Sequence, residues 1–313
     1  MTTRFDIVGL GEAMIEFNAA RATDACTWLQ GFGGDTSNAI VAAARLGART
    51  GYVTRVGDDA FGRRLVELWR EEGVATDAVD VDSERPTGVY FVSHGARGHE
   101  FSYLRAGSAA SRMTPSSLPR EVIAGARILH LSAISQAISS SAADACDAAI
   151  ALAREAGGRV SYDTNLRLKL WPLARARATI RATFAHVDWV LPSLDDATLL
   201  FDDERPDAIV DLCHAWGAPL AVLKLGAGGC LVSDGQRRER IDGYRVATVD
   251  ATGAGDCFDG AFIARTLAGD DPFAAARYAN AAAALATTGY GAVAPLPGDA
   301  AVRALLASSP GAS

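Results

Sequence analysis

The stretch Val249-Asp250-Ala251-Thr252-Gly253-Ala254-Gly255-Asp256 decides how the rest of the chain is interpreted. Residues 243–249 before it are typical of a strand, and residues 257–267 after it are typical of a helix. The glycines between them allow backbone N–H groups to approach an anion closely, and the start of the helix adds partial positive charge. Because Asp250 and Asp256 bracket this turn, it is suited to hold a phosphoryl group while a carboxylate reaches an attacking hydroxyl.

Two other interpretations of the turn use the same residues. It could be an ordinary strand-to-helix turn in which Asp256 caps the helix. A Walker A loop is excluded, because no Gly-Lys followed by Ser or Thr closes the turn.

Outside this turn, the chain alternates between strand-like and helix-like segments. A buried first strand is expected at residues 5–11, and further strands at 127–132, 159–163, 189–191 and 221–225. Helical segments lie between the later strands, and two more helices are expected at 257–267 and 273–287. This order predicts an α/β fold with a parallel sheet covered by helices on both faces.

The bulk properties exclude several classes of protein. The chain has 313 residues and a net charge of −7, which suits one large α/β domain and argues against a nucleic-acid partner. Five cysteines without a C-x-x-C pattern are expected to be reduced, which favours a cytoplasmic location. We expect neither a signal peptide nor a membrane span.

The glycine-rich segments near the N-terminus offer a second candidate site. Residues 9–14 are not a dinucleotide motif, because Met14 stands where Gly or Ala is needed. Glu12 in this turn is expected to be a solvated residue. The segment Gly31-Phe32-Gly33-Gly34-Asp35-Thr36-Ser37-Asn38 opens a helix, and Asp35 and Asn38 could pair with sugar hydroxyls; alternatively, it is only a flexible helix start.

A hairpin is expected from two strands at residues 87–93 and 100–105, joined by a turn at 95–98. Tyr90, Tyr103 and Arg105 would line its faces, either as a plain surface sheet or as a lid that offers aromatic walls and a guanidinium. Such an exposed hairpin could also pair with a second copy of the chain, so a homo-oligomer through the lid is expected. We place the lid strands as insertions at about 12–32 and 86–110 in a single domain spanning 1–313.

Two loops follow strand ends, where ligands bind in open α/β sheets. Residues 163–172 form a polar and basic loop, and residues 224–230 form a glycine-rich turn that a β-hairpin could equally use. Asn280, within an Ala-rich helix, could touch an adenine or could be a buried residue bonded to backbone.

The string Asp-x-Thr-Gly-Ala-Gly-Asp at 250–256 resembles the signature of the ribokinase-like (PfkB) family of sugar kinases. Gly-Gly-x-x-x-Asn at 33–38 resembles its second signature, and Val-Gly-Asp-Asp-x-Phe-Gly at 56–62 also occurs in the family. The resemblance runs from residue 9 to about 291. It implies a doubly wound, mostly parallel sheet flanked by helices, with a small β-sheet lid, and a kinase that uses ATP and Mg²⁺.

Within the family, the chain is most similar to the 2-keto-3-deoxygluconate kinases, through residues 33–38, 103–110 and 163–171. The resemblance implies Asp256 as the catalytic base and Mg²⁺ bound mainly through ATP phosphates. It implies that the sugar acid is held by Gly34, Asp35, Asn38, Tyr90, Tyr103, Arg105, Arg167 and Asp250. It implies that ATP is held by Asn165, Arg167, Lys224, Gly226, Ala227, Gly229, Gly253, Ala254, Gly255 and Asn280.

Arg105 and Arg167 favour an acidic sugar over a neutral one as the substrate, because a guanidinium can donate two parallel hydrogen bonds to a carboxylate. Arg167 could instead serve ATP alone, so a fructokinase or another sugar kinase stays open, as does a catalytically silent sugar-binding regulator. One motif departs from the family: its Asn-x-x-Glu, tied to Mg²⁺ and phosphate, is Ser193-Leu194-Asp195-Asp196 here. We therefore assign no metal ligand.

Overall fold

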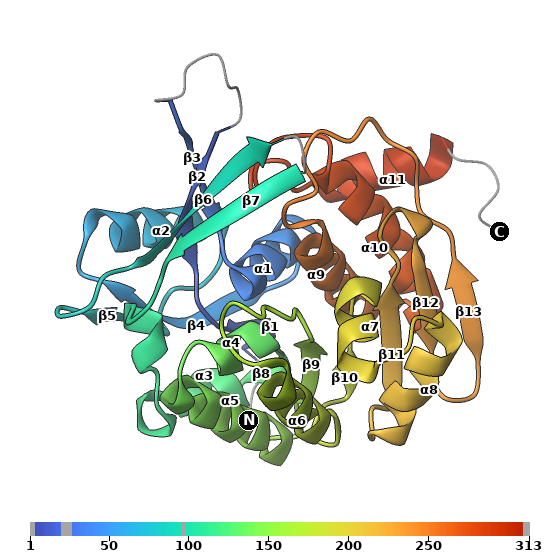
Figure 1. Cartoon of the computed structure of the whole chain (residues 1–313), viewed down its shortest axis with the longest axis horizontal. Coiled ribbons are helices and arrows are strands. Elements are labelled where there is room, and N and C mark those ends of the chain that lie inside the picture. The colour runs from blue at the N-terminus through green and yellow to red at the C-terminus, as the bar shows by residue number, and fades with distance from the viewer. Residues whose placement is uncertain (1–3, 20–26, 96–97, 309–313) are drawn as a thin grey trace.

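A nine-stranded sheet runs through the molecule, with β1 near one end of a mostly parallel order (Figure 1). The computed structural model describes residues 4–19, 27–95 and 98–308. In spatial order, the strands are β13 (Arg238–Ile241), β12 (Cys230–Ser233), β11 (Leu220–Lys224), β10 (Trp189–Val190), β9 (Arg159–Asp163), β8 (Ala126–Ser132), β1 (Phe5–Leu10), β4 (Thr50–Gly57) and β5 (Val79–Asp82). Only the pairings of β12 with β11 and β13 are antiparallel.

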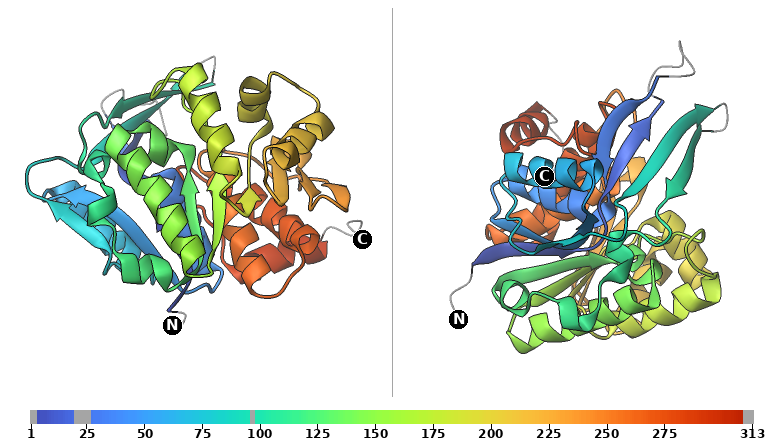
Figure 2. Two further views of the ribbon diagram at one scale, coloured as in Figure 1. Left: turned by 90° about the horizontal axis from the view of Figure 1, so that it is seen from below. Right: turned by 90° about the vertical axis from the view of Figure 1, so that its left-hand side faces the viewer.

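Helices cover both faces of this sheet (Figure 2). One layer holds α1 (Asp35–Arg45), α2 (Ala60–Glu71), α9 (Ala254–Leu267), α10 (Pro272–Ala286) and α11 (Asp299–Ser308). The other holds α3 (Arg120–Ala124), α4 (Ala133–Ala137), α5 (Ser140–Glu155), α6 (Leu173–Phe184), α7 (Leu194–Phe201) and α8 (Pro206–Ala215). Successive strand side chains point to opposite faces, so Ile7 packs in the first core and Val8 in the second.

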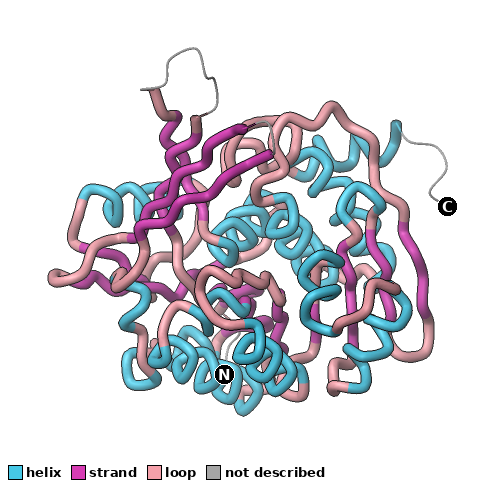
Figure 3. The backbone as a smooth tube through the Cα atoms, in the orientation of Figure 1, coloured by secondary structure: helices cyan, strands magenta, loops and turns pink. Residues whose placement is uncertain are grey.

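A second sheet of four strands projects from the body (Figures 2 and 3). Its order is β3 (Leu29–Gly33), β2 (Met14–Asn18), β6 (Gly88–Gly95) and β7 (Gly98–Leu104). Strands β6 and β7 form the expected hairpin, with Tyr90 opposite Tyr103. Ala96 and Arg97, in the turn expected at 95–98, lie outside the described residues.

The prediction of a strand at residues 243–249 is wrong. This segment forms no strand and joins no sheet, and its last amides bond elsewhere: the N–H groups of Val249 and Asp250 donate to the carbonyl of Thr287, at 2.7 and 3.1 Å. It therefore passes the end of α10 instead of adding a strand beyond β13. The following helix, α9, begins at Ala254 and so includes Asp256 in its first turn.

The glycine-rich turn after β11 is a β-hairpin connection, since Lys224 pairs with Cys230 across it. Within the described part of the chain, every helix is too short or too polar to cross a bilayer.

Candidate active site

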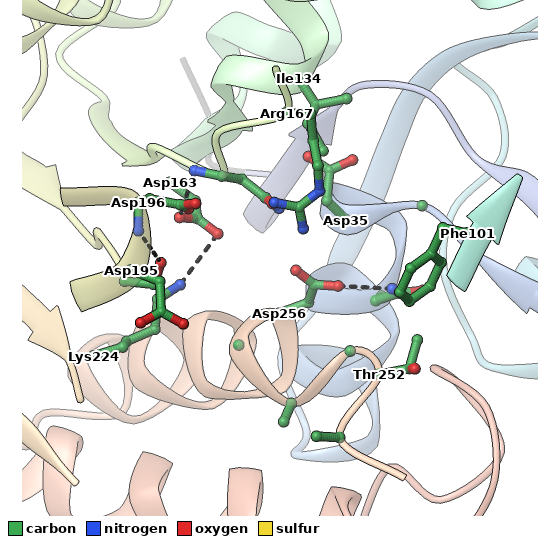
Figure 4. A pocket seen from close by; sticks show the side chains of 18 of the residues that line it. Asp35, Phe101, Ile134, Asp163, Arg167, Asp195, Asp196, Lys224, Thr252 and Asp256 are labelled. Atoms are coloured by element: carbon green, nitrogen blue, oxygen red, sulfur yellow. Dashed lines mark hydrogen bonds and ion pairs between the residues drawn. The ribbon is translucent and has the colours of Figure 1, made fainter. Parts of the chain in front are cut away.

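A cleft of about 670 Å³ opens where the carboxyl ends of the strands meet the small sheet and the start of α9 (Figure 4). The small sheet, the start of α1, α4, the loops that follow β9, β10 and β11, and residues 251–256 all line it. Of the residues that the sequence singles out, the cleft brings together Gly34, Asp35, Asn38, Tyr90, Tyr103, Arg105, Asn165, Arg167, Lys224, Gly226, Gly253, Ala254, Gly255 and Asp256. Asp250, Ala227, Gly229 and Asn280 do not line it.

Asp256 points into this cleft from the first turn of α9 (Figure 4). Its carboxylate accepts a hydrogen bond of 2.8 Å from the side-chain amide of Asn38 on α1. Burial raises the pKa of Asp256 to about 7, the nearby carboxylate of Asp35 adds to the effect, and the Asn38 hydrogen bond opposes it. The positive end of α9 would by itself lower the pKa of Asp256, but the effect of burial is larger. A carboxyl that titrates near neutrality is well matched to proton transfer.

The start of α9 leaves its backbone N–H groups without a side-chain cap. Gly253 occupies the N-cap with φ 76°, and no side chain caps the helix. A Cβ at Gly253 would lie 2.9 Å from the backbone oxygen of Ala292, whereas a Cβ at Gly255 would meet only the Lys224 ammonium, at 3.7 Å. Glycine is thus required at 253 by conformation and by space, and the site fits a phosphoryl group that receives the helix N–H groups.

Asp250 holds this turn in shape. Its carboxylate accepts hydrogen bonds from the N–H and hydroxyl of Thr252, at 2.9 and 2.7 Å, and from the N–H of Gly291, at 3.0 Å. The residue is only 1% exposed. The expectation that Asp250 contacts the sugar from the cleft wall is therefore not supported by its placement, because its oxygens face the turn and the loop at residue 291.

Lys224 sits below Gly255 and is held by two carboxylates. Its ammonium lies 3.1 Å from Asp163 at the end of β9 and 2.9 Å from Asp259 on α9. All three groups are buried, and the two carboxylates raise the pKa of Lys224 against the effect of burial. The lysine therefore links α9 to the carboxyl end of β9. Its positive charge is already paired with two carboxylates in the absence of a phosphate.

Arg105 is also paired. Its guanidinium forms a buried ion pair with Glu12, which in addition accepts a hydrogen bond from the hydroxyl of Ser108. The interpretation of Glu12 as a solvated turn residue is wrong, since it is 1% exposed. The turn after β1 folds beneath the small sheet, and a buried carboxylate there needs a cation. Two of the guanidinium nitrogens of Arg105 therefore already donate to Glu12, which leaves fewer donors for the carboxylate of a sugar acid.

The small sheet supplies an aromatic wall. Tyr90 and Tyr103 stack with ring centroids 5.9 Å apart, and Phe101 continues the stack at 6.3 Å from Tyr103. Gly33 makes room for this wall, because a Cβ there would come within 2.1 Å of the Tyr90 hydroxyl oxygen.

The opposite wall is polar. Arg167 reaches toward the centre of the cleft near Asp35, and Asp163, Asp195 and Asp196 follow along the loops (Figure 4). Asp196 accepts a hydrogen bond of 3.0 Å from the N–H of Leu166, which joins the loops after β9 and β10. Sequence reasoning missed the cleft position of Ile134, which lies in no recognisable motif, and that of Asp195, which occupies an unspecified position of the family's Asn-x-x-Glu motif.

Three residues expected at the nucleotide lie elsewhere. Asn280 is buried and donates from its side-chain amide to the carbonyls of Ile241 and Asp242, at 3.2 and 3.3 Å, which is the backbone-bonded alternative. Ala227 and Gly229 belong to the β11–β12 turn beyond the cleft edge. A Cβ at Gly229 would lie 2.0 Å from the Ile241 oxygen, so this glycine serves close backbone packing.

The fold and the cleft define a class of enzyme: an α/β phosphotransferase in which a helix start receives an anion and an adjacent carboxylate faces an acceptor. Residues 4–299 match the pfkB family carbohydrate kinases, and the chain belongs to this family. It is a carbohydrate kinase with the ribokinase-like fold, as the sequence predicts.

The relatives of this chain include two kinds of sugar kinase at similar identity. A 2-dehydro-3-deoxygluconokinase of Thermoproteus tenax is 36% identical over 89% of this chain and 87% of its own. A probable fructokinase-5 of Arabidopsis thaliana is 33% identical over 96% of this chain and 97% of its own. The structure of a Vibrio cholerae O395 fructokinase in fructose-, ADP- and calcium-bound form covers 97% of this chain and 99% of its own, with a TM-score of 0.88 and 30% identity.

Proposed function

We propose that this kinase transfers the γ-phosphoryl group of ATP to the primary hydroxyl of 2-keto-3-deoxygluconate (also named 2-dehydro-3-deoxygluconate), giving 2-keto-3-deoxy-6-phosphogluconate. The observation that carries the proposal is the position of Asp256, which faces the cleft beside a helix start with no side-chain cap. The sugar would lie between the aromatic wall of the small sheet and Asp35, and the nucleotide along the loops after β9 and β11.

In this mechanism, Asp256 accepts the proton of the sugar hydroxyl and orients its oxygen toward the γ-phosphorus. Asn38 holds the carboxylate in place through its 2.8 Å hydrogen bond. The N–H groups at the start of α9 stabilise charge on the transferred group, and Lys224 adds fixed positive charge below Gly255. Phosphoryl transfer has a loose transition state, so positioning and charge contribute most of the catalysis.

A magnesium ion would neutralise phosphate charge when bound. Among residues 4–19, 27–95 and 98–308, no group of three or more His, Cys, Asp or Glu side chains forms a metal cage. The fit is therefore to an ion held mainly by ATP oxygens and water, with Asp163, Asp195 and Asp196 near enough to the cleft to bind its water shell.

The acidic sugar is supported by Arg167, which lines the cleft and whose guanidinium donates a 2.8 Å hydrogen bond to the backbone oxygen of Leu166 in its own loop. A guanidinium in this position can receive the sugar carboxylate. Fructose phosphorylation is the second candidate, and the Arg105–Glu12 ion pair favours it, because it leaves one fewer free cation for a carboxylate.

The test is ADP release from the purified chain with MgATP and a panel of sugars that includes 2-keto-3-deoxygluconate, gluconate, fructose and ribose. The proposal expects the highest kcat/KM with 2-keto-3-deoxygluconate. A higher kcat/KM with fructose would assign the second candidate. Sugar binding without any ADP release would contradict a kinase and favour a silent sugar-binding regulator.

Two further properties belong to the same proposal. We place the chain in the cytoplasm, since the four cysteines that the structure describes are buried thiols. We also propose a homo-oligomer formed through the small sheet, on which Trp28 and Leu104 are 37% and 67% exposed. Light scattering of the wild type and of Leu104→Glu would measure the assembly, and an unchanged mass would contradict this interface.

A further inference from the structure

A continuous set of hydrogen bonds leads from the aromatic wall to the turn before α9. It starts at Tyr90, which lines the cleft and is the register partner of Glu16 on the neighbouring strand. The Tyr90 hydroxyl donates to the Glu16 carboxylate. Met14, Glu16 and Asn18 alternate along β2, so they share the face on which Met14 lines the cleft.

Asn18 continues the path across a large separation in sequence. Its side-chain amide donates to Glu16 at 3.3 Å and to Asp250 at 3.5 Å. Asp250 in turn receives the N–H groups of Thr252 and Gly291. One carboxylate therefore connects the small sheet, the turn at 250–256 (below, the anion turn) and the loop at residue 291.

The surrounding backbone is shaped to this path. A Cβ at Gly291 would lie 3.0 Å from a Glu16 carboxylate oxygen, and a Cβ at Gly31 would lie 3.4 Å from the same oxygen. With Gly33 beside the Tyr90 hydroxyl, three glycines make room for the tyrosine and the acid. Glu16 and Asn18 are 1% and 0% exposed, so neither is a solvated surface side chain.

The cost of burying Glu16 indicates that its hydrogen bonds have a particular role. Burial raises the pKa of Glu16, and the hydrogen bonds from Tyr90 and Asn18 counteract it. A buried acid is costly without such partners, and an apolar side chain of similar size would fill the space without the cost. A purely structural role would not need an acid and an amide aligned toward Asp250.

We propose that Glu16 and Asn18 are positioning residues that couple sugar binding at the small sheet to the geometry of the anion turn. A sugar that packs on Tyr90 fixes its hydroxyl on Glu16, and Glu16 and Asn18 then hold Asp250 and the turn that receives the phosphoryl group. The inference rests on the proposed kinase function but does not depend on which sugar is the substrate.

The test measures this coupling by calorimetry. The Kd of a non-hydrolysable MgATP analogue, which keeps the γ-phosphoryl group, is determined with and without a saturating concentration of the sugar that the panel identifies. We expect the sugar to tighten binding of the analogue by about tenfold in the wild type, within the usual range for two coupled sites. In Glu16→Gln and Asn18→Ala, the factor should fall to about twofold or less, while the Kd of the analogue alone stays within about twofold of wild type, because neither residue lines the cleft.

Two further variants keep the result interpretable. Tyr90→Phe keeps the ring and removes only the bond to Glu16, so it should lose coupling even if Glu16→Gln folds poorly. Glu100→Gln changes an exposed acid on β7 and is the matched control, which should keep the full factor.

Wild-type coupling in Glu16→Gln, Asn18→Ala and Tyr90→Phe would overturn the inference, as would a wild type in which sugar does not affect binding of the MgATP analogue. Complete loss of sugar binding in Glu16→Gln alone would also overturn it, since Glu16 would then be a direct ligand. The proposed function fails separately, if the wild type releases no ADP with any sugar.

Discussion

Asp256→Asn should stabilise the folded protein at alkaline pH while it abolishes turnover. The pKa of Asp256 is raised from 3.8 to about 7 by burial and by Asp35. An acid with a raised folded-state pKa is protonated in the folded chain and ionised in the unfolded chain between these values. Stability is therefore lost as pH rises through this window, and above about pH 7 the full penalty applies. Asparagine keeps the shape and can still accept the hydrogen bond from Asn38.

The size of this stability penalty follows from the raised pKa of Asp256. A difference of about three between its folded and unfolded pKa, at ~1.4 kcal/mol per unit, gives an upper limit of ~4 kcal/mol for the penalty above pH 7. The side chain of Asp256 is partly exposed, so solvent screens part of this penalty. We therefore expect about half of the limit, ~2 kcal/mol, as the gain in stability of the variant at pH 8. For a chain of this size, the gain corresponds to a rise in Tm of roughly 3 °C.

The assay is thermal unfolding of wild type and Asp256→Asn at pH 5 and pH 8, without ligands. The advantage of the variant should be about 1–2 kcal/mol greater at pH 8 than at pH 5, where the wild-type carboxyl is already protonated. Asp195→Asn, which removes an exposed acid at the same cleft, is the matched control variant. An equal difference at both pH values would refute the raised pKa of Asp256.

Further predictions follow from the same contacts. The kcat/KM of the wild type should fall about tenfold per unit below pH 7, because the raised pKa of Asp256 leaves less of the ionised base; a flat profile from pH 8 to 5.5 would contradict this. Arg105→Ala should cost about 3–5 kcal/mol in chemical unfolding, since Glu12 is left buried without its cation, and Glu12→Gln with Arg105→Met should recover much of the loss. Lys224→Met should cost a similar ~3–5 kcal/mol, because Asp163 and Asp259 would lose their shared cation; a stable Lys224→Met protein would refute this link between α9 and β9. Gly253→Ala should cost ~1–2 kcal/mol from φ alone and weaken MgATP binding, whereas Gly269→Ala, at φ 110° with nothing nearby, should carry only the stability cost.

The architecture could be predicted from local pattern. Parallel strands buried on both faces give continuous apolar runs, and helices between them show their own period, so β1, β8, β9 and β11 were identifiable. The segment at 243–249 has the same apolar character, but it lies at the end of α10. No local signal distinguishes an extended chain that pairs in a sheet from one that does not.

The site was predictable where a motif specifies backbone geometry. Gly253, Gly255 and Asp256 lie where the signature indicates, and at Gly253 the reason is that the turn needs a left-handed residue with no side chain. Side-chain pairing across the fold was not predictable. Glu12 with Arg105, and Lys224 with Asp259, are far apart in sequence, so their charges could not be matched in advance.

The most direct test of the central claim compares turnover and nucleotide binding in Asp256→Asn. The account predicts that kcat with MgATP and the preferred sugar falls by at least about 10²–10⁴-fold. It also predicts that the Kd of a non-hydrolysable MgATP analogue stays within about twofold of wild type, because the N–H groups at the start of α9 are unchanged. A variant that retains more than about a tenth of the wild-type kcat would show that Asp256 is not the base.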